Sequence, residues 1–293
     1  MIHKPVLVRE VLEYLKPEPD ENMVDGTCGE GGHTKLLLEK TSPRGKVLGI
    51  DADARQVENA RRNLTGFSER VVLTRDSYAH LKEIIEKYHF RPIHGILLDL
   101  GYSSWHMDAS EKGFSFNKNE PLDMRYGAGD LTAEKVVNEY KETELERMLS
   151  EYGEEKFARQ IARAIVRQRK VKRIEHTLEL ANIIEQAVGA KYRNQNIHCA
   201  TRTFQSLRIA VNDELGNLAK ALPQAIEILA PGGRLAVISF HSLEDRMVKN
   251  FFKEQEKNNV VTILTKKPIV ALPEELAQNP RARSAKLRAI IRC

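Results

Sequence analysis

The sequence predicts an α/β protein: a parallel sheet covered by helices on both faces, with a helical segment inserted between two strands. Short apolar strands alternate with helical segments over the first hundred residues. The alternation stops between about Ser110 and Ile209, where we find no strand candidate, and it then resumes. Nearly continuous apolar strands separated by helices are typical of parallel sheets. A chain of 293 residues has room for about two domains.

The elements of the first part follow from local patterns. The strand candidates are short and apolar, and each runs into a polar or glycine-rich stretch. They are residues 22–27, 45–53, 70–77 and 93–101. Helices are expected at residues 33–40, 54–64 and 78–90.

The middle part is predicted to be helical. Residues 131–153 indicate two short helices, and residues 154–170 an amphipathic one. Thr143 and Glu146 have the spacing of a capping box for the second short helix. A further helix is expected from Thr177 to Gly189.

The α/β pattern returns in the last part. Residues 212–233 predict a helix that ends in a Pro-Gly-Gly turn, and a strand at 234–240 and a helix follow. The strand candidates 260–266 and 285–292 have no convincing helix between them. We therefore expect them to form an antiparallel pair.

Composition describes a soluble globular chain, with 41% hydrophobic and 30% charged residues. The apolar runs are too short to span a bilayer, and the N-terminus has no signal-peptide pattern. A cytoplasmic location and no membrane partner are therefore expected. Three separated cysteines give no zinc or disulfide pattern, and Cys28 and Cys199 are expected to be buried.

The positive charge is concentrated in two runs. Residues 159–173 hold seven basic residues and no acidic one, and residues 281–293 hold five and none. Such runs suggest an anionic partner, with nucleic acid as the first candidate. A solvated helix face is the alternative for either run alone.

A glycine-rich turn, VDGTCGEGGHT at residues 24–34, joins the first strand to its helix. Such a turn fits NAD or S-adenosylmethionine. Asp51 ends the second strand 20 residues after Gly31, where an acid suits ribose hydroxyls. The alternative for Asp51 is a helix N-cap. The expected antiparallel hairpin favours S-adenosylmethionine, because a pure Rossmann sheet lacks it.

Longer motifs run from end to end of the chain. They are HKPVLVREVL (3–12), DGTCGEGGHT (25–34), GIDAD (49–53), GILLDLGYSS (95–104), GFSF (113–116), PLDMR (121–125), YGEEKFARQIARAI (152–165), HCATRTFQSLRIAVNDEL (198–215), LAPGGRLAVISFHSLEDRMVK (229–249) and NPRARSAKLRA (279–289). With them the chain resembles the MraW (RsmH) family of bacterial ribosomal RNA small-subunit methyltransferases, which methylate a cytidine at its exocyclic N4 amine. Cys199 and Tyr102 depart from the family pattern without removing a polar group from the expected site.

The resemblance implies a seven-stranded, Rossmann-like class I methyltransferase sheet with an inserted all-helical domain. Residues 1–109 and 210–293 would form the S-adenosylmethionine-binding domain, and residues 110–209 the RNA-recognition domain. The resemblance also implies a set of cofactor contacts, namely Gly31, Gly32, His33, Asp51, Tyr78, Asp99 and His106. Backbone N–H groups at a helix start suit the methionine carboxylate, and a tyrosine ring can flank adenine.

The expected reaction needs an acceptor beside the amine, because its lone pair is delocalised into the ring and charge develops on nitrogen. Asp99, in the segment DLGYSS at a strand end, is the candidate catalytic residue. No metal is required by this chemistry. Further candidates for positioning the substrate, each with a structural hydrogen bond or helix cap as the alternative, are Asp123, Arg125, Ser239, His241 and Asp245.

The target base must be unpaired or flipped out to reach such a site. Small-subunit ribosomal RNA, or the assembled subunit, is the expected partner. The candidate RNA contacts are Arg163, Arg167, Lys170, Arg202, Phe204 and Arg208. Three other functions compete with this one: an NAD-dependent oxidoreductase, a non-catalytic RNA-binding protein and a small-molecule methyltransferase.

Overall fold

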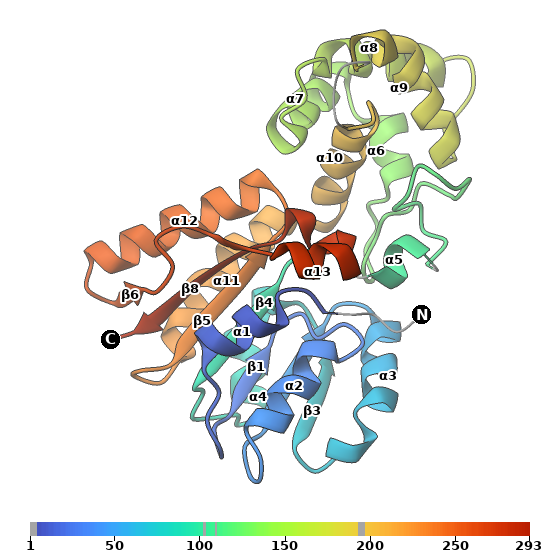
Figure 1. Ribbon diagram of the computed structural model, residues 1–293. Helices are drawn as coiled ribbons and strands as arrows, with labels where there is room; N and C mark the ends of the chain where they lie inside the picture. Colours follow the sequence, from blue (N-terminus) through green and yellow to red (C-terminus); the bar gives the residue numbers. More distant parts are fainter. Residues whose placement is uncertain (1–4, 102–103, 109, 193–196) are drawn as a thin grey trace. The chain divides into compact units, whose positions relative to one another are not determined.

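The computed structural model describes residues 5–101, 104–108, 110–192 and 197–293 (Figure 1). The chain divides into two compact units. One consists of residues 1–101 and 215–293 and carries the sheet, and the other, residues 102–214, is built of helices. No helix in the described part of the chain is both long and apolar enough to cross a membrane.

The sheet of the first unit contains strands from both halves of the chain. They are β1 (Met23–Asp25), β2 (Val47–Asp51), β3 (Val71–Arg75), β4 (Gly95–Asp99), β5 (Arg234–Ser239), β6 (Val261–Ile263), β7 (Ile269–Val270) and β8 (Lys286–Arg292). The strand order is β3-β2-β1-β4-β5-β8-β6, and the two-residue β7 also pairs with β8.

Neighbouring strands from β3 to β5 pair in parallel, whereas β8 is antiparallel to β5 and to β6. The predicted fold class and the predicted antiparallel pair are therefore confirmed. Strand β7 was not predicted, because two residues are too few to give a periodic pattern in the sequence.

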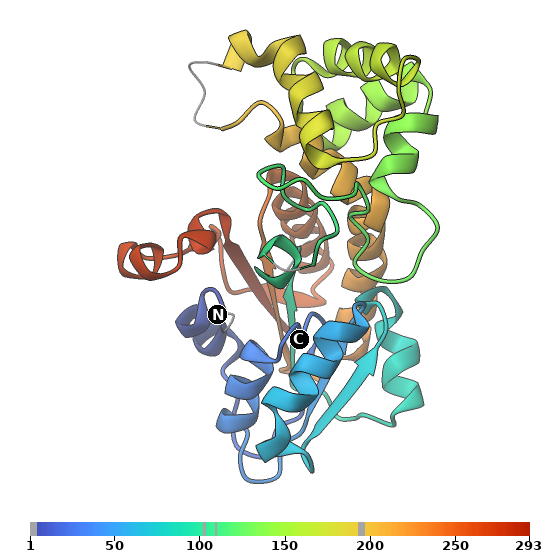
Figure 2. The ribbon, with the colours of Figure 1, turned by 90° about the vertical axis from the view of Figure 1, so that its right-hand side faces the viewer.

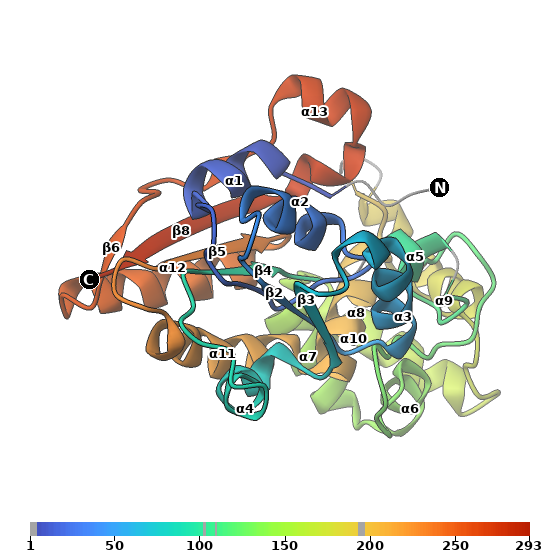
Figure 3. The same ribbon diagram turned by 90° about the horizontal axis from the view of Figure 1, so that it is seen from below.

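Helices cover both faces of this sheet, as Figure 3 shows for α1 and α2 on one side and α4 and α11 on the other. The first face packs against α1 (Val8–Leu15), α2 (Gly32–Lys40) and α3 (Ala54–Asn63). The second packs against α4 (Leu81–Lys87), α11 (Glu214–Ile228) and α12 (Ser242–Lys257). Successive strand residues alternate between the two cores: Leu97 belongs to the first, and Ile96 and Leu98 to the second.

Between β7 and β8 the structure has a helix that the sequence pattern did not reveal. It is α13 (Pro273–Gln278), and a 3₁₀ turn (Pro280–Ser284) follows it. Pro273 at the first helical positions and two acidic residues in the first turn are local start signals. Six residues are too few to show helical periodicity, so the expectation of no helix in this segment was wrong.

The second unit is a helical bundle, drawn in green to yellow-brown in Figure 2. Its helices are α5 (Ser104–Asp108), α6 (Ala133–Glu139), α7 (Glu142–Gly153), α8 (Ala158–Arg169), α9 (Thr177–Tyr192) and α10 (Thr201–Asn212). They enclose a separate apolar core in which Ile161, Leu180 and Leu207 are fully buried.

Some helix boundaries in this bundle differ from expectation, and α8 for example begins at Ala158. Helix α9 runs past Gly189 to Tyr192, because the Tyr192 ring is buried against Phe157 and anchors the last turn in the core. Helix α7 is capped by Glu144, whose carboxylate accepts a hydrogen bond from the Lys141 N–H at 2.7 Å. The predicted capping box was therefore misplaced by two residues.

Candidate active site at the carboxyl edge of the sheet

The glycine loop after β1 is held close to the sheet. The Gly26 N–H donates to the Leu97 carbonyl at 2.9 Å. A β-carbon on Gly26 would lie 2.5 Å from Leu98 Cδ2 and 3.4 Å from Tyr78 Cβ. A larger residue would require the Leu98 side chain to shift, so glycine suits this close approach, which brings the loop beside Tyr78. Gly31, with φ +90°, then turns the chain into α2 in a conformation that L side chains rarely adopt.

Two threonines of the loop organise the neighbouring strand-end acids. Thr34 donates from Oγ1 to the buried Asp25 carboxylate at 2.6 Å. Thr27 Oγ1 accepts from the Asp99 N–H at 2.7 Å. Burial raises the pKa of Asp25, and the Thr34 hydrogen bond opposes that rise. Sequence reasoning missed both threonines; the available signal was a pair of hydroxyl residues shortly after a strand-end acid.

Asp51, at the end of β2, is fixed by the backbone. Its carboxylate accepts hydrogen bonds from the Gly29 N–H at 2.9 Å and the Asp53 N–H at 2.8 Å. Burial raises its pKa to about 7 against the effect of these bonds. The N-cap of α3 is Asp53, whose side chain accepts from the Arg55 N–H. The helix-cap alternative for Asp51 is therefore wrong.

His33 and Asp99 form a buried pair. His33 Nε2 lies 3.5 Å from Asp99 Oδ2, and the side chains are 7% and 16% exposed. Within the described residues, neither ring nitrogen of His33 nor Asp99 Oδ1 has a hydrogen-bond partner. Burial alone lowers the pKa of His33, but the Asp99, Asp25 and Glu275 carboxylates raise it above its ordinary value. The surrounding acidic groups therefore favour the protonated form of His33.

The carboxyl ends of neighbouring parallel strands bring these groups to one edge of the sheet. Asp25 is in register with Gly49 on one side and with Leu97 on the other, so the ends of β2 and β4 flank the glycine loop. The predicted cofactor residues gathered at this edge are Gly31, Gly32, His33, Asp51, Tyr78 and Asp99. Ligands of open α/β sheets bind at such an edge.

The whole chain, residues 1–293, matches the family described as the MraW methylase family. The chain belongs to this family. One relative, from Heliobacterium modesticaldum, is 49% identical over 98% of this chain and 97% of its own length, and is called ribosomal RNA small subunit methyltransferase H. A relative of the same name from Kosmotoga olearia is 48% identical over 98% of this chain and 96% of its own length. The protein is an S-adenosylmethionine-dependent methyltransferase.

The residues at the edge fit the cofactor of a MraW methylase. The start of α2 has no side-chain cap, so its first N–H groups suit the methionine carboxylate. The unpartnered Asp99 oxygen suits a cationic ammonium or sulfonium group. Asp51 suits the ribose, because two backbone bonds hold its carboxylate in one orientation. These individual contacts remain predictions.

His106, also predicted to contact the cofactor, belongs to the helical unit. Its ring is 4% exposed and lies at 5.1 to 5.4 Å, edge to face, from the rings of Trp105, Phe114 and Tyr126. Histidine among aromatic rings is held rigidly. Its contact with the cofactor stays a prediction. Tyr102 lies outside the described residues.

Helix α8 presents a row of basic side chains to solvent. Arg159, Arg163 and Arg167 follow one another at i, i+4 spacing, and Lys170 continues the row. Arg163 lies 3.2 Å from Glu142, whereas Arg167 and Lys170 make no ion pair with any described residue. The predicted phosphate-binding residues therefore share one accessible face.

Three other predicted RNA contacts have structural partners in α10 or beside it. Arg202 donates to the Glu154 carbonyl at 2.6 Å. Phe204 is 5% exposed and packs edge to face on Phe116, so its ring serves the core, and its contact with RNA stays a prediction. Its face of α10 is directed into the core.

Arg208 is also enclosed by the helical unit. It is 9% exposed, and its guanidinium donates to both carboxylate oxygens of Glu214, at 2.8 and 3.1 Å. Tyr126 donates to the same carboxylate at 2.7 Å. Arg208 thus has a structural role as a buried, paired cation, and its contact with RNA stays a prediction.

The remaining substrate-positioning candidates have the intramolecular partners that the structural alternative predicts. Arg125 donates to both oxygens of Asp123, and Arg288 to both oxygens of Asp245. His241 is the N-cap of α12. Ser239 Oγ donates to the Lys286 carbonyl at 3.3 Å.

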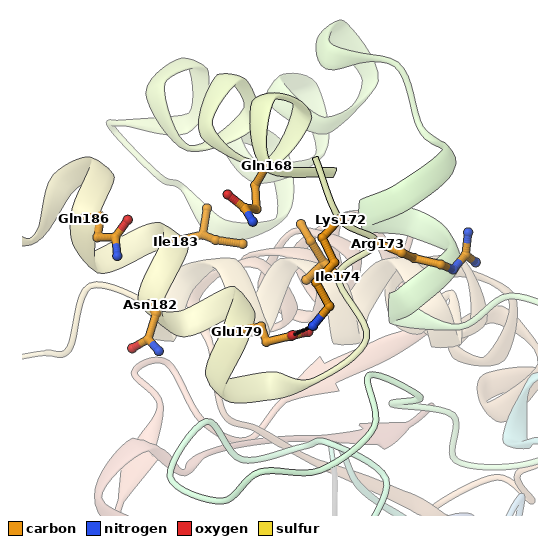
Figure 4. Close-up of a pocket in the computed structure, with 8 residues that line it drawn as sticks. All are labelled: Gln168, Lys172, Arg173, Ile174, Glu179, Asn182, Ile183 and Gln186. Atoms are coloured by element: carbon orange, nitrogen blue, oxygen red, sulfur yellow. Dashed lines mark hydrogen bonds and ion pairs between the residues drawn. The ribbon is translucent and has the colours of Figure 1, made fainter. Parts of the chain in front are cut away.

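The helical unit also contains a pocket of about 190 Å³ beside α9 (Figure 4). It is lined by Gln168, Lys172, Arg173, Ile174, Glu179, Asn182, Ile183 and Gln186. Its cations are already neutralised, because Lys172 lies 2.6 Å from Glu179, and Arg173 lies 2.7 Å from Glu134. The pocket therefore has little residual charge to offer an anion.

Proposed function

We propose that the protein transfers the methyl group of S-adenosylmethionine to the exocyclic N4 amine of a cytidine in small-subunit ribosomal RNA. Membership of the MraW methylase family supports this proposal. The observation that carries the chemistry is the unpartnered, buried Oδ1 of Asp99 at the carboxyl end of β4. A buried polar atom without a partner costs free energy, so it indicates a ligand group that completes it.

Asp99 is proposed to accept a hydrogen bond from the cytosine amine. As the nitrogen bonds to the methyl carbon, the bond from that carbon to sulfur would break, the nitrogen lone pair leaves conjugation, and one N–H proton is released toward the Asp99 carboxylate. A carboxylate acceptor held in place beforehand stabilises this developing positive charge. The Thr27 hydroxyl fixes the backbone of Asp99, and His33 lies beside its second oxygen. The free oxygen is therefore directed by a rigid frame.

The cofactor supplies an electrophilic methyl group on a sulfonium. The protein residues hold the two reactants in line and at contact distance. The entropy cost of bringing the reactants together is therefore met by binding energy before the reaction begins. In this proposal the start of α2 and Asp51 orient the cofactor. Tyr78 flanks the adenine, and Asp99 holds the amine.

The RNA is proposed to bind in part through α8. The exposed guanidinium and ammonium groups of Arg167 and Lys170 have no acidic partner among the described residues and suit phosphates. Such contacts position a strand without reading its sequence. They would hold the RNA while the target base is unstacked.

The decisive experiment supplies the protein with S-adenosylmethionine tritiated in its methyl group and with undermethylated small-subunit RNA or assembled subunits. Nucleoside analysis of the product should find the label in N4-methylcytidine. Label in another nucleoside, or in no nucleoside of either substrate, would refute the proposal.

A further inference from the structure

The second basic run of the sequence lies outside every site described so far. It passes through the 3₁₀ turn at Pro280–Ser284 into β8. Arg281 and Arg283 are exposed on the turn, and Lys286, half-buried, begins the strand. In Figure 1 this stretch, in red, connects α13 to β8. We call residues 281–286 the edge segment.

Strand pairing places the edge segment at the edge of the sheet that carries the acids. Lys286 pairs with Ser239, the last residue of β5, and Asp99 pairs with Ile238, one residue earlier. Because β8 is antiparallel to β5, its amino end meets the carboxyl ends of the parallel strands. The edge segment therefore lies along the same edge as Asp99 and belongs to the same compact unit.

Two cations of the edge segment, Arg283 and Lys286, differ in their surroundings from the cation deeper in the strand. Arg288, two residues further on, is 6% exposed and paired with Asp245 at 2.6 Å. Arg283 and Lys286 make no ion pair with any residue that the structure describes. The buried cation Arg288 thus has an ionic partner, whereas Arg283 and Lys286, nearer the edge of the sheet, have none among the described residues.

Apolar side chains lie beside these cations. Val270 is directly opposite Lys286 in the β7–β8 pairing and is 53% exposed. Leu272, two residues later, is 46% exposed. Lys266 and Lys267, also exposed, follow β6 at this edge. Cations next to exposed apolar groups suit a polyanion with sugar and base faces better than a small free anion.

We propose that the edge segment is a second RNA-binding surface, located on the catalytic unit. Arg283 and Lys286 contact phosphates of the strand that carries the target nucleotide, and Val270 lies against an adjacent ribose or base. This inference rests on the proposed function, since it takes the substrate to be RNA. In this inference the catalytic unit binds the RNA strand directly, next to the reacting amine.

The test uses the full-length chain and a double variant, Arg283→Gln with Lys286→Gln. The matched control is Lys40→Gln with Lys46→Gln. Both control lysines are exposed, and neither makes an ion pair with a described residue. They lie at the end of α2 and just before β2, so they mark the opposite, amino edge of the sheet. Filter binding of undermethylated small-subunit RNA is measured over a series of salt concentrations, and S-adenosylhomocysteine affinity is measured by calorimetry.

We expect the double variant to bind RNA with a log–log salt slope shallower by about 1.4, at about 0.7 for each phosphate contact on a single strand. Its KM for RNA should rise, and its affinity for S-adenosylhomocysteine should equal that of the wild type. Arg283→Gln alone, which lies outside the sheet, should lower the slope by about 0.7. The control pair should keep the wild-type slope.

A wild-type slope in both edge-segment variants would overturn the inference. A defect seen only with assembled subunits and not with naked RNA would also overturn it, because it would indicate a protein partner. Failure of the proposed function is distinguishable, since the wild-type protein would then place no label on cytidine N4.

Discussion

Asp51 combines two opposed electrostatic effects in one carboxylate. Burial raises its pKa to about 7, and the hydrogen bonds from the Asp53 and Gly29 N–H groups favour the charged form. The carboxylate is thus oriented by the backbone before any ligand arrives. A preoriented acceptor loses little entropy when it receives the two ribose hydroxyls.

The first prediction removes this acceptor. Asp51→Ala should weaken S-adenosylmethionine binding by roughly 2 to 4 kcal/mol, because the variant cannot form charge-assisted hydrogen bonds to the ribose. That corresponds to about 30- to 1,000-fold in Kd. Calorimetry with S-adenosylhomocysteine measures the change directly. Wild-type affinity in the variant would exclude Asp51 from the cofactor site.

The second prediction concerns pH. Since the pKa of Asp51 is about 7, the carboxyl group becomes protonated as pH falls through that value, and affinity for S-adenosylhomocysteine should fall with it. The effect on folding has the opposite sign. A raised folded-state pKa stabilises the folded protein at low pH, and this stabilisation is lost as pH rises through about 7.

The Asp51→Asn variant is the control for this pH dependence, because its amide does not titrate. Its affinity should be nearly constant across the same pH range. A variant that keeps the wild-type pH profile would assign the titration to another group, such as His33.

The third prediction separates catalysis from binding at Asp99. Asp99→Asn preserves shape but replaces a charged acceptor with an amide, so stabilisation specific to the transition state is lost. The single-turnover methyl-transfer rate at saturating cofactor and RNA should fall about 100-fold or more. Asp76→Asn is a matched control. Asp76 directly follows β3, much as Asp99 ends β4, but its carboxylate is paired with His80 at 2.8 Å. A near-normal rate for Asp99→Asn would leave Asp99 as a binding residue only.

Helix α8 has two faces with different surroundings. Ile161 and Ile165 are buried in the core, while the arginine row lies on the exposed face. The helical period separates the two sets of side chains. Substitutions on the exposed face should therefore change binding without changing stability.

The fourth prediction uses the triple variant of Arg163, Arg167 and Lys170 to Gln. The log–log salt slope of RNA binding should become shallower by about 0.7 to 0.9 for each phosphate that the variant no longer neutralises. S-adenosylhomocysteine affinity and the thermal midpoint should stay at wild-type values. An unaltered slope would mean that this face is only solvated.

The chain contains separate apolar cores. The catalytic unit has one core on each face of its sheet, and the helical unit has its own. Separate cores allow the two units to unfold in separate transitions.

The fifth prediction tests this independence. Ile161→Ala, at a fully buried site of the helical core, should destabilise that unit by about 2 to 5 kcal/mol. Leu48→Ala, its counterpart in the sheet, should destabilise the catalytic unit instead. In calorimetric scans, S-adenosylhomocysteine should raise the transition affected by Leu48→Ala, because most of the predicted cofactor residues belong to that unit. A single transition shifted equally by both substitutions would show that the units unfold together.

Local patterns in the amino-acid sequence were enough to predict the fold class and the edge of the sheet where the candidate site lies. Apolar runs and their spacing predicted the parallel strands and the final hairpin, and the strand-end positions of Asp51 and Asp99 located the edge. The family resemblance supplied the reaction, and the match over the whole chain confirmed the family.

Which side chains contact one another depends on packing between distant segments of the chain. The contact of His33 with Asp99 and the bond from Asp99 to Thr27 join residues that are far apart in the chain. Phe204 and Arg208 are buried in the helical unit, although a mixture of basic and aromatic residues in this segment suggested an RNA-binding surface. Strand pairing alone brought Lys286 beside the end of β5. Such contacts depend on how distant segments pack, and local periodicity carries no information about that.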